Sequence, residues 1–193
     1  ILERRPEDLV SKWLLHIATM TLGRPPESVR PAWRLERKPE GSQPVLEPFT
    51  DVAGPLGLAG GGISGGCILD DFDNDGLFDV VTSSMASCAP MSYFHQNADG
   101  TFTEQSAKAG LGDQMGGLNM VQSDYNNDGC TDVLVLRGGW EQPQRNSLLR
   151  NDCNGTFTDV TVDSGLAQPT STQTAVWTDI DNDGFVDLFV GNE

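Results

Sequence analysis

The sequence predicts an all-β fold of repeated units, preceded by a short α-helix and a proline-rich linker. The main observation is an acidic nine-residue motif, Asp-x-Asp/Asn-Asn-Asp-Gly-x-x-Asp, which occurs at residues 71–79, 124–132 and 179–187. The starts of the motif lie 53 and then 55 residues apart, and short apolar runs flank each copy. A period of this length is typical of propellers and solenoids, in which each repeat is one supersecondary unit.

Residues 1–23 are predicted to form the helix. Pro6 suits a first helical turn and Gly23 suits a helix end. The apolar residues between them recur at helical spacing and form one stripe: Leu9, Val10, Trp13, Leu14, Ile17 and Met20. Residues 24–48 hold six prolines, which prevent the helix from continuing, so this segment is predicted to be an extended linker.

Residues 49–193 are predicted to be the repeat region. A Phe-Thr pair opens each unit, at Phe49, Phe102 and Phe157, and a Gly-Leu pair follows it. The first Asp of each acidic motif comes 14 residues after that glycine in all three units. Strand-like runs flank the motifs, and the apolar run after each motif is predicted to be a buried strand. Hairpin turns are expected at residues 97–100 and 151–155, so each unit has the content of one four-stranded propeller blade.

The acidic motif has the pattern of a calcium-binding loop. Calcium takes six to eight oxygen ligands, which carboxylates, side-chain amides and backbone carbonyls supply. Positions 1, 3, 5 and 9 would supply side-chain oxygens and position 7 a carbonyl. The candidate ligands are therefore Asp71, Asp73, Asp75, Leu77, Asp79, Asp124, Asn126, Asp128, Cys130, Asp132, Asp179, Asp181, Asp183, Phe185 and Asp187, which together would hold about three Ca²⁺ ions.

The motif has two other interpretations. An EF-hand requires a glutamate at position 12, where this sequence has Thr82, Val135 and Val190. Clusters of Asp, Asn and Gly also arise in ordinary surface turns. Three copies with the same oxygen spacing favour calcium over turn chemistry alone.

The composition limits the function and the location. A net charge of −16 argues against nucleic-acid binding, and no run of 18 apolar residues is present to span a membrane. The motifs supply 11 of the 28 acidic residues, so three calcium ions would change the charge from −16 to −10. Calcium modules with weak sites work where calcium is about millimolar, which predicts an extracellular, cell-surface or periplasmic location.

The four cysteines allow three disulfide connectivities. We favour the short-range pairs Cys67–Cys88 and Cys130–Cys153. Four buried thiols remain the alternative, since cysteine is often a small buried apolar residue.

The motifs and their following apolar strands resemble the FG-GAP repeats of integrin α-subunit propellers, also called VCBS-type repeats in bacteria. The stretch from Arg150 to Leu166 is similar to the cartilage acidic protein family and its bacterial relatives with the ASPIC and UnbV domain. The resemblance covers residues 46–193. It implies a calcium-loaded propeller of seven blades, or at least of six to eight, of which this chain would hold about three. It also implies export and a role in adhesion or assembly, and we expect the chain to be a piece of a longer protein.

The sequence therefore predicts an extracellular or cell-surface module that binds a protein or a glycan. Its function would lie in the loops that vary between repeats, at residues 59–66, 83–91 and 138–145. The alternative is a structural subunit of a surface filament or larger complex, with possible self-association. An exported hydrolase is less well supported, because no Ser-His-Asp set stands out and His95 is a lone histidine beside a hairpin. The chain is predicted not to be an enzyme.

Overall fold

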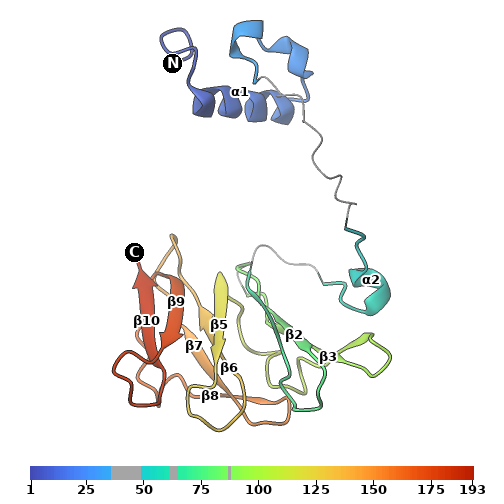
Figure 1. The fold of residues 1–193 in the computed structure, drawn as a ribbon, viewed down its shortest axis with the longest axis vertical. Coiled ribbons are helices and arrows are strands. Elements are labelled where there is room, and N and C mark those ends of the chain that lie inside the picture. The colour runs from blue at the N-terminus through green and yellow to red at the C-terminus, as the bar shows by residue number, and fades with distance from the viewer. Residues whose placement is uncertain (36–48, 61–64, 87) are drawn as a thin grey trace. The chain divides into compact units, whose positions relative to one another are not determined.

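A computed structural model describes residues 1–35, 49–60, 65–86 and 88–193. The chain separates into two compact units, Ile1–Phe49 and Thr50–Glu193 (Figure 1). The linker predicted at 24–48 lies partly outside the described residues, as does part of each of the variable loops at 59–66 and 83–91.

The first unit contains one α-helix, α1 (Leu9–Thr21). Asp8 caps its N-terminus, since the Asp8 Oδ1 atom accepts a hydrogen bond of 3.2 Å from the backbone N–H of Val10. This cap makes the helix shorter than the predicted 1–23. Two short 3₁₀ turns, η1 (Pro26–Ser28) and η2 (Pro31–Trp33), follow where an extended segment was expected. Among the described residues, no helix is long and apolar enough to cross a membrane.

The second unit begins with a single helical turn, α2 (Ala53–Leu56), and continues as antiparallel β-structure. The first sheet has the order β1 (Cys67–Asp70), β2 (Asp79–Thr82), β3 (Ser92–Gln96), β4 (Phe102–Glu104). The second has the order β5 (Asn119–Ser123), β6 (Asp132–Leu136), β7 (Ser147–Asn151), β8 (Phe157–Asp159). The third pairs β9 (Thr172–Thr178) with β10 (Asp187–Asn192). The predicted all-β class is confirmed.

The three sheets follow one another in chain order. Within the described residues, β1 lies beside β5, and β5 lies beside β9, so the first strands of the three sheets are neighbours. Each sheet is a meander of consecutive strands, as in a propeller blade. The strands differ in burial: β6 is buried along its whole length, whereas Phe189 on β10 is 57% exposed. The prediction of a buried strand after the third motif was therefore wrong for this chain, because β10 lies in a sheet of only two described strands.

The core between the first two sheets is centred on Phe72. This side chain has no exposed surface and packs edge-to-face against Tyr93, at a ring distance of 6.2 Å, and Phe157, at 5.4 Å. Tyr93 belongs to the first sheet and Phe157 to the second. Position 2 of the first acidic motif therefore joins two blades, a role that the metal-ligand pattern does not indicate.

The Phe-Thr and Gly-Leu signatures also join neighbouring repeats. Gly57 has φ +86°, and a Cβ atom there would lie 2.4 Å from the carbonyl oxygen of Phe102, in the next unit. Gly110 has φ +77°, and its Cβ would lie 3.0 Å from the carbonyl oxygen of Phe157. Glycine is required at these positions by both the left-handed backbone and the close approach of the next repeat.

Candidate metal centres

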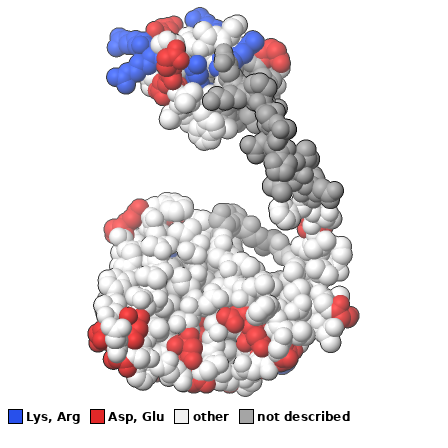
Figure 2. Space-filling model, in the orientation of Figure 1, with Lys and Arg blue, Asp and Glu red and all other residues white. Residues whose placement is uncertain are grey.

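Each acidic motif forms the loop between two paired strands. The loops join β1 to β2, β5 to β6 and β9 to β10, and the last Asp of each motif is the first residue of the second strand. Figure 2 shows acidic side chains along the lower edge of the sheet unit, the end at which the β9–β10 loop lies in Figure 1. We call these segments loop 1 (71–79), loop 2 (124–132) and loop 3 (179–187).

The first aspartate organises the backbone of each loop. In loop 1, Asp71 accepts hydrogen bonds from the backbone N–H groups of Asp75, at 3.0 Å, and Gly76, at 2.9 Å. Asp124 and Asp179 accept from the equivalent groups of loops 2 and 3. The glycine at position 6 has φ of +88°, +86° and +91° in the three loops, which explains its presence in every copy.

The asparagine at position 4 has a role that the sequence analysis missed. Asn74, Asn127 and Asn182 all adopt a left-handed conformation, with φ of 60°, 57° and 62°. Asparagine tolerates this region better than most side chains. The amide of Asn127 also donates a hydrogen bond of 2.9 Å to the carbonyl of Gly184 in loop 3, and the amide of Asn74 contacts Cys130 Sγ of loop 2 at 3.4 Å. Neighbouring loops are thus connected directly.

The aspartate at position 9 is buried in the first two loops. Asp79 is 0% exposed; it accepts hydrogen bonds from the Tyr93 hydroxyl, at 2.6 Å, and the Gln96 backbone N–H, at 2.8 Å. Asp132 is 1% exposed and accepts a 2.8 Å bond from the Asn151 N–H. Burial raises the pKa of Asp132 to about 6, although hydrogen bonds from Asn151 and Tyr125 oppose the shift. A buried carboxylate with a raised pKa is stabilised in its charged form by a cation.

This pKa shift predicts the pH dependence of the metal-free protein. In the unfolded chain Asp132 has the ordinary pKa of 3.8 and loses its proton at about pH 4. The folded protein keeps this proton up to about pH 6. Stability from this proton is fully present below about pH 4 and is lost as the pH rises through about 6. A shift of two pKa units corresponds to about 3 kcal/mol.

We expect urea unfolding in chelator to show this loss as a difference between wild type and Asp132→Asn. The wild type should lose more unfolding free energy than the variant between about pH 4 and pH 7. Parallel pH profiles for the two proteins would contradict the assigned role of Asp132.

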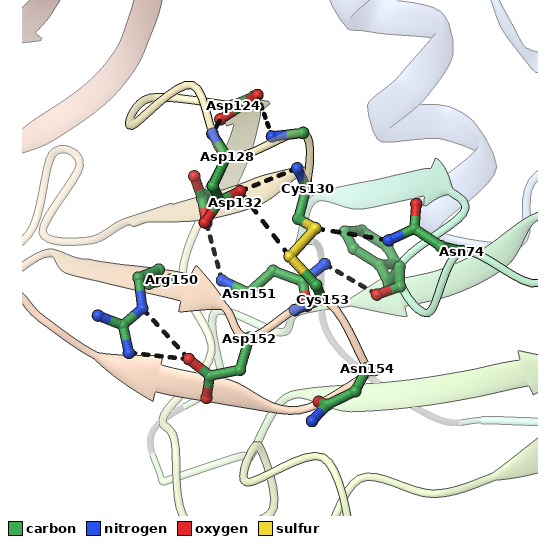
Figure 3. Close-up of a disulfide and its surroundings, with 12 residues drawn as sticks. Asn74, Asp124, Asp128, Cys130, Asp132, Arg150, Asn151, Asp152, Cys153 and Asn154 are labelled. Atoms are coloured by element: carbon green, nitrogen blue, oxygen red, sulfur yellow. Dashed lines mark hydrogen bonds and ion pairs between the residues drawn. A yellow bond between two sulfur atoms is a disulfide. The ribbon is translucent and has the colours of Figure 1, made fainter.

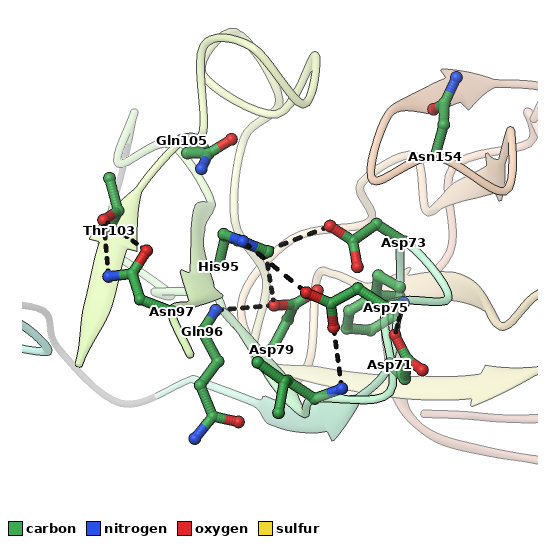
Figure 4. Close-up of polar contacts among 12 residues, drawn as sticks. Asp71, Asp73, Asp75, Asp79, His95, Gln96, Asn97, Thr103, Gln105 and Asn154 are labelled. Carbon is green, nitrogen blue, oxygen red and sulfur yellow. Dashed lines mark hydrogen bonds and ion pairs between the residues drawn. The ribbon is translucent and has the colours of Figure 1, made fainter. Parts of the chain in front are cut away.

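The structure brings different parts of the predicted ligand sets together. In loop 3, one oxygen from each of Asp179, Asp181 and Asp187 lies within 4.8 Å of the others. In loop 1, the converging set is Asp73, Asp75 and His95, and Figure 4 shows the three side chains directed toward one another. Asp71 and Asp79 are not part of that set. Asp79 lies next to it, because its Oδ1 atom is 3.2 Å from His95 Nδ1.

Loop 2 is less converged than the others. Its compact group contains Asp128 with the sulfur atoms of Cys130 and Cys153, and those sulfurs form a disulfide, so they are not available as thiolates. The Asn126 amide donates a 2.7 Å hydrogen bond to Asp128 Oδ2. Asp124 and Asp132 lie outside the compact group.

The donor chemistry in loops 1 and 3 fits a divalent cation. The converging atoms are carboxylate oxygens, the ligands that calcium prefers, joined in loop 1 by an imidazole nitrogen of His95. In loop 1 the Oδ1 atom of Asp73 is buried, with no hydrogen-bond partner in the described structure. Burial also raises the pKa of Asp73, with further contributions from the charges of Asp79 and Asp75. A cation would satisfy this oxygen and offset the repulsion among the carboxylates.

The predicted disulfide Cys130–Cys153 is confirmed, and the predicted Cys67–Cys88 pair was wrong. The bond joins position 7 of loop 2 to the turn between β7 and β8 (Figure 3), and the Cα atoms are 5.4 Å apart. Cys67 and Cys88 are free and exposed. The strand register places Thr82 opposite Cys67, and Cys88 lies six residues further along the chain, beyond the end of β2.

We expect loss of the disulfide to lower stability by about 3 kcal/mol, since the bond closes a loop with a sequence separation of 23. The measurement is urea unfolding of Cys130→Ser/Cys153→Ser against wild type, in saturating calcium. Cys67→Ser/Cys88→Ser is the matched control and should change stability by less than about 0.5 kcal/mol. Equal effects of the two double substitutions would contradict this assignment.

The repeat with its acidic loop defines the class of protein. FG-GAP-like repeats match residues 71–135 and 124–190, which together cover more than half of the chain. The chain therefore belongs to the FG-GAP-like repeat family.

Among individual proteins, the chain is similar to cartilage acidic protein 1. The Homo sapiens protein is 29% identical over 191 residues, which cover 94% of this chain and 27% of that protein. The Mus musculus protein has the same identity and coverage. The chain thus spans about a quarter of the length of these curated relatives.

His95 is the functional candidate that the sequence analysis misjudged. It was interpreted as a lone structural histidine, but it lies among the carboxylates of loop 1. Comparison of the repeats could have found it, because His95 and Arg150 follow the last Asp of their loops at similar distances. His95 follows the last Asp of loop 1 by 16 residues, and Arg150 follows that of loop 2 by 18. These two side chains occupy equivalent places on β3 and β7, since Phe94 pairs with Val80 and Leu149 pairs with Val133.

Proposed function

We propose that this chain is a calcium-stabilised interaction module of an extracellular, cell-surface or periplasmic protein. The observation that carries the proposal is the convergence of carboxylate oxygens in loops of a repeat family whose sequence pattern matches calcium ligation. The loop residues named above would hold the ions. A bound ion would offset carboxylate repulsion and fix the hairpin that each loop closes. The sheets would be blades of a larger propeller, of seven blades by resemblance.

A hollow between the first two sheets is the proposed binding surface. It has a volume of about 180 Å³ and is lined by parts of two loops that vary between repeats, together with the segment before β5. Met85 and Cys88 come from the variable loop at 83–91, and Trp140 and Glu141 from the one at 138–145. Trp140 is 61% exposed. An exposed aromatic side chain beside a hollow is suited to recognition of a protein or a glycan.

Arg137 in the wall of this hollow supports binding over catalysis. It is 5% exposed, and its guanidinium donates hydrogen bonds to the carbonyls of Met115, Gly116 and Arg145 and to the Ser147 hydroxyl. Burial lowers the pKa of Arg137 to about 10, so the group still carries its charge at neutral pH. This fixed, charged guanidinium connects the segment before β5 to the β6–β7 hairpin and supplies no general base.

The proposal is tested by binding of the immobilised chain to arrays of extracellular proteins and glycans. We expect a ligand whose binding requires calcium, is lost after chelation and is weakened at least tenfold by Trp140→Ala. Phe78→Ala is the matched control, because Phe78 is a similarly exposed aromatic residue, at 60%, within loop 1. Binding that tolerates both chelation and Trp140→Ala would contradict the proposal.

The exposed stripe on α1 favours a second candidate, a structural subunit that assembles with other copies. Trp13 is 55% exposed and Leu9 68%. Exposed apolar patches often mark interaction sites. Sedimentation analysis of wild type and Trp13→Glu distinguishes the candidates, since self-association through α1 should be lost in the variant. A monomeric wild type would exclude this candidate.

A further inference from the structure

The imidazole of His95 lies within the carboxylate cluster of loop 1 (Figure 4). Its Nδ1 atom is 3.2 Å from Asp73 Oδ2 and 3.2 Å from Asp79 Oδ1. Its Nε2 atom is 4.0 Å from Asp75 Oδ2. Three of the four predicted side-chain ligands of the loop therefore surround one nitrogen heterocycle.

These contacts do not have the geometry of hydrogen bonds. The Nδ1 atom of His95 is buried and has no hydrogen-bond partner in the described structure, and the same is true of Asp73 Oδ1. Buried polar atoms without partners are rare and costly, so each requires an explanation. The unsatisfied oxygen belongs to the loop 1 carboxylate whose other oxygen lies 3.2 Å from the unsatisfied imidazole nitrogen, which indicates that a third species belongs between the two side chains.

A shared metal ion accounts for the distances. Two ligand atoms bound to one ion at about 2.1 Å and at right angles lie about 3 Å apart. The separations of 3.2 Å between the imidazole nitrogen and two carboxylate oxygens are close to that value. A protonated imidazole acting as a counter-ion would instead direct an N–H at a carboxylate oxygen, and Nδ1 makes no such bond.

The other loops lack this nitrogen. The equivalent of His95 beside loop 2 is Arg150, whose guanidinium pairs with Asp152 at 2.8 Å in the following turn. In loop 3 the converging groups of the described residues are the three carboxylates. Loop 1 is therefore the one loop in the described structure in which an imidazole joins the oxygen donors.

We propose that His95 is a direct metal ligand and makes loop 1 a mixed nitrogen–oxygen site for a divalent first-row transition ion in preference to calcium, with Mn²⁺ as the paramagnetic probe. Imidazole is a good ligand for such ions, whereas calcium favours oxygen alone. Calcium would fill loop 1 only in the absence of the transition ion. The inference rests on the proposed metal-binding role of the loops and adds a difference in selectivity between them.

Pulsed electron paramagnetic resonance of Mn²⁺ added to the metal-free chain tests the proposal. We expect strong ¹⁴N modulation from a bound imidazole in the wild type, and its loss in His95→Ala, with Mn²⁺ affinity at this site at least tenfold weaker. His16→Ala removes the only other histidine of the chain and should keep the signal. Arg150→Ala changes the equivalent position beside loop 2 and should also keep it. Millimolar calcium should displace Mn²⁺ from the other loops before it displaces the nitrogen-coupled Mn²⁺ of loop 1.

A second readout does not depend on whether the variant folds. In wild type labelled with ¹⁵N-histidine, the ¹⁴N modulation should disappear, because the imidazole that binds Mn²⁺ then contains ¹⁵N in place of ¹⁴N. Absence of nitrogen modulation in the wild type, or its persistence in His95→Ala, would overturn the inference. Calcium-dependent stability of the same samples reports separately on the proposed function, so either proposal can fail while the other holds.

Discussion

Removal of calcium from the protein with EDTA is expected to lower its melting temperature by about 10–15 °C relative to the calcium-loaded form. Ligands that bind only the folded state stabilise it by mass action, by about 1.4 kcal/mol per site at ten times the dissociation constant. Three such sites give about 4 kcal/mol, and each kcal/mol corresponds to about 2–4 °C for a domain of this size. The charge repulsion left among the carboxylates acts in the same direction.

The loss should be reversed by adding calcium back, as measured by circular dichroism or calorimetry. Sodium chloride at matched ionic strength is the control for general screening, which weakens interactions between exposed charges. It should restore little of the melting temperature. A melting curve that chelation leaves unchanged would mean that the loops are ordinary acidic hairpins.

Replacement of Phe72 by alanine is expected to destabilise the protein by about 3–5 kcal/mol, the usual cost of removing a buried aromatic side chain. Phe72 has no exposed surface and contacts the rings of Tyr93 and Phe157, which belong to different sheets. Its carbonyl also accepts hydrogen bonds from the Asn151 amide, at 2.9 Å, and the Gly155 N–H, at 3.2 Å. The substitution should therefore weaken the junction between two blades.

Urea unfolding of Phe72→Ala in saturating calcium measures this cost. Phe78→Ala is the matched control from the same loop, since Phe78 is 60% exposed, and it should change stability by less than about 0.5 kcal/mol. Similar losses for the two variants would show that the junction does not depend on Phe72.

The fold was largely predictable because its determinants are local and repeated. Three copies of one motif, with apolar runs at constant offsets, determine strand, loop and strand in that order. The hairpin of each loop and those at 97–100 and 151–155 have the expected pairing. The burial of the third repeat was not predictable, because it depends on which strands lie beside β10 rather than on the residues of β10.

The candidate ligands of the loops remain a prediction, and the structure adds partners that no local pattern could identify. Tyr93 and Asn151 contribute to their respective loops from strands that follow by more than ten residues. Burial raises the pKa of the Tyr93 hydroxyl, so this group stays protonated and donates to Asp79. His95 reaches loop 1 through the pairing of β2 with β3, a tertiary relationship that spacing within the motif does not contain.

The stoichiometry of calcium binding tests the central claim most directly. Isothermal titration or equilibrium dialysis of the metal-free wild type should give about three ions per chain, one for each acidic loop. Each of the double substitutions Asp71→Asn/Asp75→Asn, Asp124→Asn/Asp128→Asn and Asp179→Asn/Asp183→Asn should remove about one ion and leave the other two. Absence of calcium binding in the wild type, or a stoichiometry that none of the three variants changes, would contradict the assignment of these loops as metal centres.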